Sequence, residues 1–497
     1  MKKLFPASFY NPITLVGAVI VAVSALNILF LFLLETFAVH QKPYMGIVAF
    51  VILPGFLILG LLLVGGGIIR EHHRDQPKEP SEQRLPTIDL NNPQQLVAFI
   101  VFCLGTLLLL MFTAFGSYKA YEYTESERFC GELCHKVMEP EYTAYKFSPH
   151  ARVACVECHI GSGADWFVRS KISGSYQAYA TVFKTYPRPI PTPIKNLRPA
   201  QETCERCHWP EHFFSEKLKV GSYFLSDERN IRWTLSMLMK IGGGNIEAGP
   251  TSGIHWHMNI ANSVTYVAVD PMRSVIPWVR TRALDGREKI YRSSEVAISD
   301  KDLKDMPKRV MDCIDCHNRP SHIYNPPARS INHLMTLGWI DPQLPNIKGI
   351  GVKALENKYN SRQEGLDGIR LMIEEFYRES YPAIAISMKA EIQRAILELQ
   401  KTYSRNYFPY MKVSWKKFPD HIGHLYSPGC FRCHDGKHVS ADGKVLSKDC
   451  NLCHVILAQE FEKNKMRISL SGLEFRHPGE VGDAWKEMNC SECHGAH

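Results

Sequence analysis

Residues 129–159, FCGELCHKVMEPEYTAYKFSPHARVACVECH, contain two cysteine–histidine motifs, and motifs of this kind decide the fold. The stretch ends on the pentapeptide Cys-x-x-Cys-His, the attachment signature of c-type haem, in which two thiols form thioether bonds and the histidine ligates the iron. With 15 Cys and 21 His in the chain, random placement would give on the order of 0.02 copies. Six copies occur, beginning at Cys155, Cys204, Cys313, Cys430, Cys450 and Cys490.

The same stretch begins with a seventh, irregular site, in which three residues separate Cys130 from Cys134 and His135 follows. With it, 14 of the 15 cysteines form pairs that are each followed by His, and only Cys103 remains. The sequence therefore predicts seven covalently bound haem c groups. The predicted attachment residues are Cys130, Cys134, Cys155, Cys158, Cys204, Cys207, Cys313, Cys316, Cys430, Cys433, Cys450, Cys453, Cys490 and Cys493, and the iron ligands beside them are His135, His159, His208, His317, His434, His454 and His494.

Zinc and thiol redox chemistry are the rival interpretations of Cys/His clusters. A structural zinc site combines two Cys pairs, or one Cys pair with a spaced His pair, and does not need His directly after every second Cys. A thioredoxin-like Cys-x-x-Cys motif would occur once. The repeated motif therefore favours haem over both.

Histidines outside the motifs can supply the second axial ligand that each low-spin haem needs. Residues 130–497 contain eleven of them. His255-Trp-His257 is predicted on a strand, where residues two apart share one face, so that one of the two imidazoles reaches a haem. Six others lie close to a motif and are predicted ligands: His150, His212, His322, His424, His438 and His497.

Three uncharged apolar runs precede the motifs: residues 13–34, 43–69 and 96–118. Each is long enough to cross a hydrocarbon core of about 30 Å as a helix. Lys2 and Lys3 precede the first run and four basic residues lie between the second and third, whereas only Lys42 lies between the first and second. The positive-inside rule then predicts an inner-membrane protein with a cytoplasmic amino end and a periplasmic haem region.

These features predict three regions: a membrane anchor at 1–118, a domain with haems one to three at 119–210, and a further periplasmic region with haems four to seven at 211–497. We expect a mostly α multihaem cytochrome c with long loops, a small β segment within 253–292 and helices over 354–403. The formal net charge is +8, which suits the haem propionates. The absence of a concentrated Lys/Arg stripe argues against nucleic-acid binding, and the oligomeric state is left open.

The succession Cys130 to Met138, Ser148-Pro-His150, Cys155 to His159 and Lys171 resembles the NapC/NirT family of membrane-anchored multihaem quinol dehydrogenases. The resemblance covers residues 96–207. It implies oxidation of menaquinol at the outer membrane face and transfer of electrons to periplasmic c-type cytochromes in anaerobic respiration. It also implies a quinol site near haem one.

The family's residues carry over in part. Lys171 matches the quinol-contacting lysine, twelve residues after His159. The methionine that can replace the first motif histidine as iron ligand corresponds to Met138, although Met138 follows His135 by three residues instead of two. The family's acidic residue falls on Ala178, so Glu122, Glu125 or Asp165 would have to accept the proton.

Three functions remain open from the sequence. The first is a menaquinol-oxidising electron conduit. The second is a terminal reductase of a nitrogen or sulfur oxyanion, which needs an iron with an open coordination position. The third is a non-catalytic membrane carrier that receives electrons from another subunit.

Overall fold

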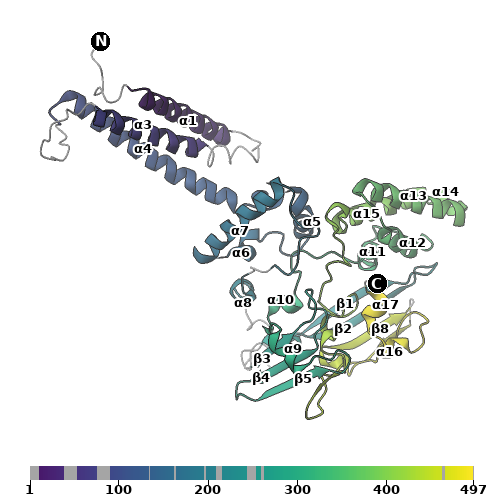
Figure 1. The fold of residues 1–497 in the computed structure, drawn as a ribbon. Coiled ribbons are helices and arrows are strands. Elements are labelled where there is room, and N and C mark those ends of the chain that lie inside the picture. Colours follow the sequence, from purple (N-terminus) through teal and green to yellow (C-terminus); the bar gives the residue numbers. More distant parts are fainter. Residues whose placement is uncertain are drawn as a thin grey trace. The chain divides into compact units, whose positions relative to one another are not determined.

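A computed structural model describes residues 11–37, 53–74, 90–133, 135–161, 164–194, 198–208, 215–242, 253–258, 262–461 and 465–495 of the chain (Figure 1). The chain forms two compact units, residues 1–135 and 136–497. The boundary predicted between residues 210 and 211 therefore lies inside the second unit and stays a prediction.

Among the described residues of the first unit, three helices have the length and apolarity of membrane spans. These are α1 (Pro12–Phe37), α3 (Leu53–Arg74) and α4 (Pro93–Thr124), whose most apolar parts have mean hydropathies of 2.5, 2.0 and 2.7. Most of their large apolar side chains are exposed, which is the arrangement expected where lipid covers them. The protein is therefore a membrane protein.

Glycines allow α1 and α3 to pack closely. A Cβ atom added at Gly17 would lie 2.7 Å from the carbonyl oxygen of Gly60, and one at Gly60 would lie 3.0 Å from that of Gly17. Asn11 Nδ2 donates to the Gly67 carbonyl at 3.0 Å. Small residues at a shared face and one polar contact are typical of helix pairs that associate in a bilayer.

The second unit begins with helices that carry or flank the first regular motifs. They are α5 (His135–Lys146), α6 (Cys155–His159), α7 (Ala164–Val182) and α8 (Ala200–Cys204). Further short elements follow along the chain: η5 (Ile254–Met258), α9 (Asp300–Asp305), α10 (Cys313–Cys316), η6 (Pro409–Met411), η7 (Gly429–Arg432), η8 (Cys450–Leu452), α16 (Ala484–Glu487) and α17 (Cys490–His494).

Two antiparallel sheets correct the expectation of one small β segment. The first sheet has the order β1 (Glu216–Phe224), β2 (Arg232–Lys240), β8 (His454–Phe461) and β9 (Met466–Ile468). The second has the order β6 (Arg309–Val310), β3 (Asn262–Val267), β4 (Trp278–Ala283), β5 (Glu288–Ser293) and β7 (His438–Ser440). Strands distant in sequence pair in both sheets, and local alternation of apolar residues does not reveal such pairing.

The second sheet provides a small core beside the motifs. Val264, Tyr266, Ile276 and Val279 are at most 3% exposed. Trp256 and Cys433 pack against this cluster. The sheet therefore positions the turn around Trp256 and the motif that contains Cys433.

Residues 327–406 form a block of helices without a Cys-x-x-Cys-His motif, which includes the range 354–403 where helices were expected and begins before it (Figure 1). The helices are α11 (Pro327–Thr336), α12 (Ile347–Glu356), α13 (Arg362–Ser380), α14 (Pro382–Ser387) and α15 (Lys389–Asn406). Ile331, Leu355, Ile369, Ile373 and Leu399 are fully buried between them. We call this segment the helical block.

Candidate haem-binding sites

Each of the six regular motifs begins in a short helix: α6, α8, α10, η7, η8 or α17. In the third, fourth and fifth motifs the histidine N–H donates to the carbonyl of the first cysteine, for example His317 to Cys313 at 2.8 Å. One helical turn therefore brings the cysteine pair and the histidine together. None of the 14 cysteines that the structure describes forms a disulfide.

The irregular first motif has a different backbone. Residues Phe129–Leu133 form a single π turn, and α5 begins at His135. A π turn holds one more residue than an α turn, which accommodates the third residue between the cysteines. Cys134 lies outside the described residues.

Six motif histidines each lie beside one histidine from outside the motifs. The ring centroids of these pairs are 5.9–6.4 Å apart. The pairs are His159 with His322, His208 with His150, His317 with His255, His434 with His257, His454 with His424, and His494 with His477.

This spacing fits one metal between two imidazoles. Metal–nitrogen bonds to histidine are about 2.0 Å long, so two imidazoles on opposite sides of one iron have centroids about 6 Å apart. Direct ring stacking would bring the centroids closer, as for His424 and Phe431 at 4.2 Å. The paired residues therefore fit a haem that is ligated from both faces.

Hydrogen bonds orient the histidines from outside the motifs. Nδ1 of His255, His257 and His322 donates to a backbone carbonyl at 2.7, 2.9 and 3.0 Å. His150 Nδ1 makes a longer contact of 3.3 Å with the Pro320 carbonyl. Such bonds fix the tautomer that leaves the Nε2 lone pair available to a metal.

Burial keeps several of these rings neutral, as ligation requires. Burial is the main cause that lowers the pKa of His322. It also lowers the pKa of His424 to about 4, and His454 adds to the effect.

His438, which the sequence suggested as a ligand, is held differently. Its Nδ1 lies 2.9 Å from Asp435 Oδ1, and its Nε2 lies 2.7 Å from the Ile276 carbonyl oxygen. Both ring nitrogens are therefore occupied by protein groups, and the structure leaves none for an iron. His421 likewise uses Nε2 to contact the Met272 carbonyl.

His477 lies beside His494 of the seventh motif, although the sequence did not suggest it as a ligand. It lies 13 positions before Cys490, too far to be selected as a neighbour of that motif. Its occurrence between the sixth and seventh motifs was the available signal. His212 and His497, the remaining predicted ligands, lie outside the described residues.

Neighbouring motifs contact one another. Glu157 of the second motif and Arg206 of the third form an ion pair at 2.9 Å. Arg432 of the fifth donates to the backbone carbonyl of Asp315 in the fourth at 2.6 Å. Phe431 of the fifth stacks on His424, the partner of the sixth motif's His454. These links bring the second motif beside the third, the fourth beside the fifth, and the fifth beside the sixth.

The predicted quinol-site residues lie on α5 and α7. Met138 and Lys171 are both half-buried. Helix α7 exposes Ile172, Tyr176 and Val182 by 68%, 69% and 73%. This apolar surface suits a helix that lies against a bilayer. Of the alternative proton acceptors, Glu122 forms an ion pair with Lys119 at 2.8 Å.

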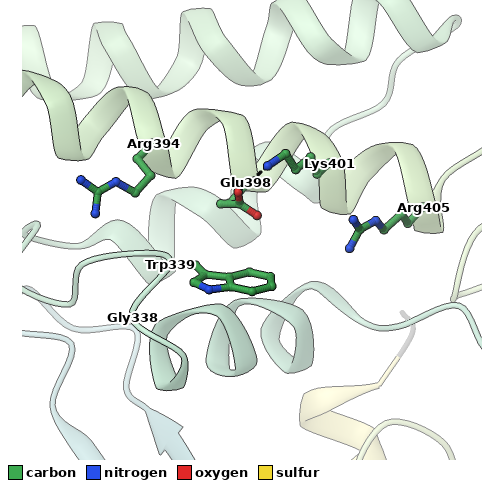
Figure 2. Close-up of a pocket in the computed structure, with 6 residues that line it drawn as sticks. All are labelled: Gly338, Trp339, Arg394, Glu398, Lys401 and Arg405. Carbon is green, nitrogen blue, oxygen red and sulfur yellow. Dashed lines mark hydrogen bonds and ion pairs between the residues drawn. The ribbon is translucent and has the colours of Figure 1, made fainter. Parts of the chain in front are cut away.

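No group of three or more His, Cys, Asp or Glu residues suited to a metal ion occurs among the described residues. A cavity of about 330 Å³ lies in the helical block and is lined by Gly338, Trp339, Arg394, Glu398, Lys401 and Arg405 (Figure 2). It contains no motif residue.

Comparison with known proteins identifies the family. The model of the NapC/NirT cytochrome c family, N-terminal region, matches residues 92–190. The cytochrome c-type protein ImcH of Geobacter sulfurreducens is 43% identical over 98% of this chain and 95% of its own length. The chain belongs to the NapC/NirT cytochrome c family.

Membership of the NapC/NirT family agrees with the sequence interpretation of a membrane-anchored multihaem c-type cytochrome. The cytochrome c-type protein NrfH of Wolinella succinogenes is 31% identical over 23% of this chain and 62% of its own length. No solved structure matches the chain. NrfH therefore matches only part of the chain, whereas ImcH matches nearly all of it.

Proposed function

We propose that this NapC/NirT protein binds seven haem c groups and conducts electrons from membrane menaquinol to periplasmic c-type cytochromes. The seven cysteine pairs attach the haems, and the motif histidines ligate them from one side. His322, His150, His424 and His477 are the second ligands of the second, third, sixth and seventh haems. The observation that carries the proposal is the 5.9–6.4 Å spacing of the six histidine pairs.

Oxidation of one menaquinol to menaquinone releases two electrons and two protons, and haem c, when bound, supplies one-electron acceptors. The contacts between neighbouring motifs support a relay that follows chain order over much of its length. Two-sided ligation also argues against a terminal reductase, because the histidine pairs leave no open coordination position at the haems they hold.

Lys171 is the proposed contact to a quinol oxygen, and Met138 is the proposed alternative ligand at the first haem. The half-buried lysine on α7 lies within a surface that exposes Ile172 and Tyr176, so a lipid-borne quinol reaches it without leaving an apolar environment. The proton acceptor is one of Glu122, Glu125 and Asp165.

The proposed location is the inner membrane, with the amino end in the cytoplasm and residues after 118 in the periplasm. The distribution of basic residues around the apolar runs supports this orientation. Haem attachment outside the cytoplasm requires the same orientation for the motifs.

The test uses the full chain in liposomes with a menaquinol analogue, and follows haem reduction by absorbance. The wild type is expected to become reduced. Lys171→Gln should reduce the rate at least about tenfold, a loss of ~1.4 kcal/mol of transition-state stabilisation. Lys184→Gln, at an exposed position just after α7, is the control and should keep the wild-type rate.

Absence of reduction in the wild type would refute quinol oxidation. Equal rates in the wild type and in variants of Lys171 and Met138 would favour a non-catalytic carrier. A haem count other than seven, measured as pyridine haemochrome per protein, would refute the proposed haem content.

A further inference from the structure

The turn around Trp256 departs from the strand that its sequence suggested. Residues Ile254–Met258 form the 3₁₀ helix η5. Successive side chains on a 3₁₀ helix are about 120° apart, so positions two apart do not share a face. His255 and His257 therefore point in different directions, whereas on a strand they would point to the same side.

Each histidine of this turn meets a different motif. The ring of His255 lies parallel to that of His317, with an interplanar angle of 3° and a centroid separation of 6.4 Å. The ring of His257 lies nearly perpendicular to that of His434, with an angle of 86° and a separation of 5.9 Å. Both separations match two imidazoles on one iron.

Backbone carbonyls orient both rings. His255 Nδ1 donates to the Ile241 carbonyl at 2.7 Å, and His257 Nδ1 donates to the Ile254 carbonyl at 2.9 Å. In each ring, a proton held on Nδ1 by this bond places the lone pair on Nε2, which is the nitrogen that a metal would take. The turn therefore presents two imidazoles, each oriented to ligate a different metal ion.

The two motifs opposite the turn are also fixed to each other. The buried side chain of Arg432 donates to the carbonyls of Asp315 at 2.6 Å and Arg273 at 2.9 Å. The Asp315 carboxylate, 1% exposed, accepts hydrogen bonds from Tyr266 and Arg309, each at 2.7 Å. Breaking such a buried charged network is costly, so the fourth and fifth motifs keep their relative position.

We propose that the single turn His255-Trp256-His257 supplies the second iron ligand to both the fourth and the fifth haem. The inference rests on the proposed function in that it needs haem at Cys313/Cys316 and at Cys430/Cys433. One rigid segment then ties two neighbouring redox centres together, and Trp256, packed on the core of the second sheet, holds that segment in place.

The ring angles give the two sites different spectroscopic signatures. Parallel imidazole planes concentrate their π interaction in one direction and split the iron d orbitals strongly, which gives a rhombic low-spin signal. Perpendicular planes leave two d orbitals nearly degenerate, which gives a low-spin signal with a large maximal g value. His255 belongs to the first kind of site and His257 to the second.

The test is electron paramagnetic resonance of the oxidised, full-length, haem-loaded protein. His255→Ala should convert one haem equivalent from rhombic low-spin to high-spin. His257→Ala should convert one equivalent from the large-g signal to high-spin, and the double variant should convert two. His333→Ala, at an exposed position of the helical block, is the matched control and should convert none.

Methionine variants keep the test decisive if alanine prevents folding. His255→Met and His257→Met should remain low-spin, because a thioether can ligate the iron, and each should raise the midpoint potential of one haem. Conversion of only one equivalent by the double variant, or of none, would overturn the inference. Haem content measured in the same samples separates that outcome from failure of the proposed function, since an intact count of seven with unchanged spin states contradicts only the role of the turn.

Discussion

The helical block and three of the motif helices, α6, η8 and α17, are built in opposite ways within one unit of the molecule. In the block, Ile331, Ile369 and Ile373 are fully buried by other side chains. In α6, η8 and α17, by contrast, no residue is buried. A helix of three to five residues is unstable alone. The comparison indicates that side chains hold the block together, whereas covalent macrocycles complete the core around the motifs.

Removing haem should destabilise the motif helices but not the helical block, and this is the most extensive effect we expect. In protein made without haem attachment, amide protection in α6 and α17 should fall by about 100-fold or more, equivalent to ~2.7 kcal/mol of local stability. Protection in α13 and α15 should stay close to that of the haem-loaded protein. Hydrogen exchange followed by mass spectrometry measures both.

Haem-loaded protein in the same detergent provides the control for this comparison. Loss of protection in α13 to the same extent as in α17 would contradict it, because the block would then depend on the haems as well.

Much of this organisation could be predicted from sequence, because covalent chemistry leaves a local signature. Each Cys-x-x-Cys-His motif carries its own attachment residues, and three apolar runs identify the membrane helices. The second ligands are a different problem. His322 follows the fourth motif but meets His159 of the second, because tertiary packing and not distance along the chain brings imidazoles together.

The local sequence pattern differs from the structure at two positions. Alternating residues around Trp256 resemble a strand, yet η5 is a 3₁₀ helix, since the turn is shaped by contacts with two motifs and a sheet core. His438 lies near a motif but pairs with Asp435. Neither contact has a sequence signature that distinguishes it from the alternatives.

A more local effect, confined to the helical block, tests the comparison from the other region. Ile373→Ala removes a fully buried side chain from α13 and should lower the local stability of the block by about 2–5 kcal/mol. Leu371→Ala, on the same helix at a position that is 55% exposed, should change it by less than about 0.5 kcal/mol. Hydrogen exchange in α13 and α15 reports the change.

Haem content and the low-spin signals should be unchanged in both variants, because neither residue belongs to a motif or to a histidine pair. Loss of haem in Ile373→Ala but not in Leu371→Ala would show that the block supports haem binding, which the comparison denies.

The smallest predicted effect concerns His438, whose two ring nitrogens contact Asp435 and the Ile276 carbonyl. Burial lowers the pKa of this imidazole, but the hydrogen bonds with Asp435 and the Ile276 carbonyl and the charge of Asp435 together outweigh burial and raise the pKa above its usual 6.5. A raised folded-state pKa gives stability that is fully present below pH 6.5 and is lost as the pH rises through the folded-state value. Wild-type protein should therefore lose stability as the pH rises from 6 to 8, and His438→Gln should not show this loss. Thermal unfolding of both proteins at the two pH values measures this difference.

The same variant separates the structural role of His438 from the ligand role that its position suggested. All haems should stay low-spin in His438→Gln, whereas loss of an iron ligand would leave one haem high-spin.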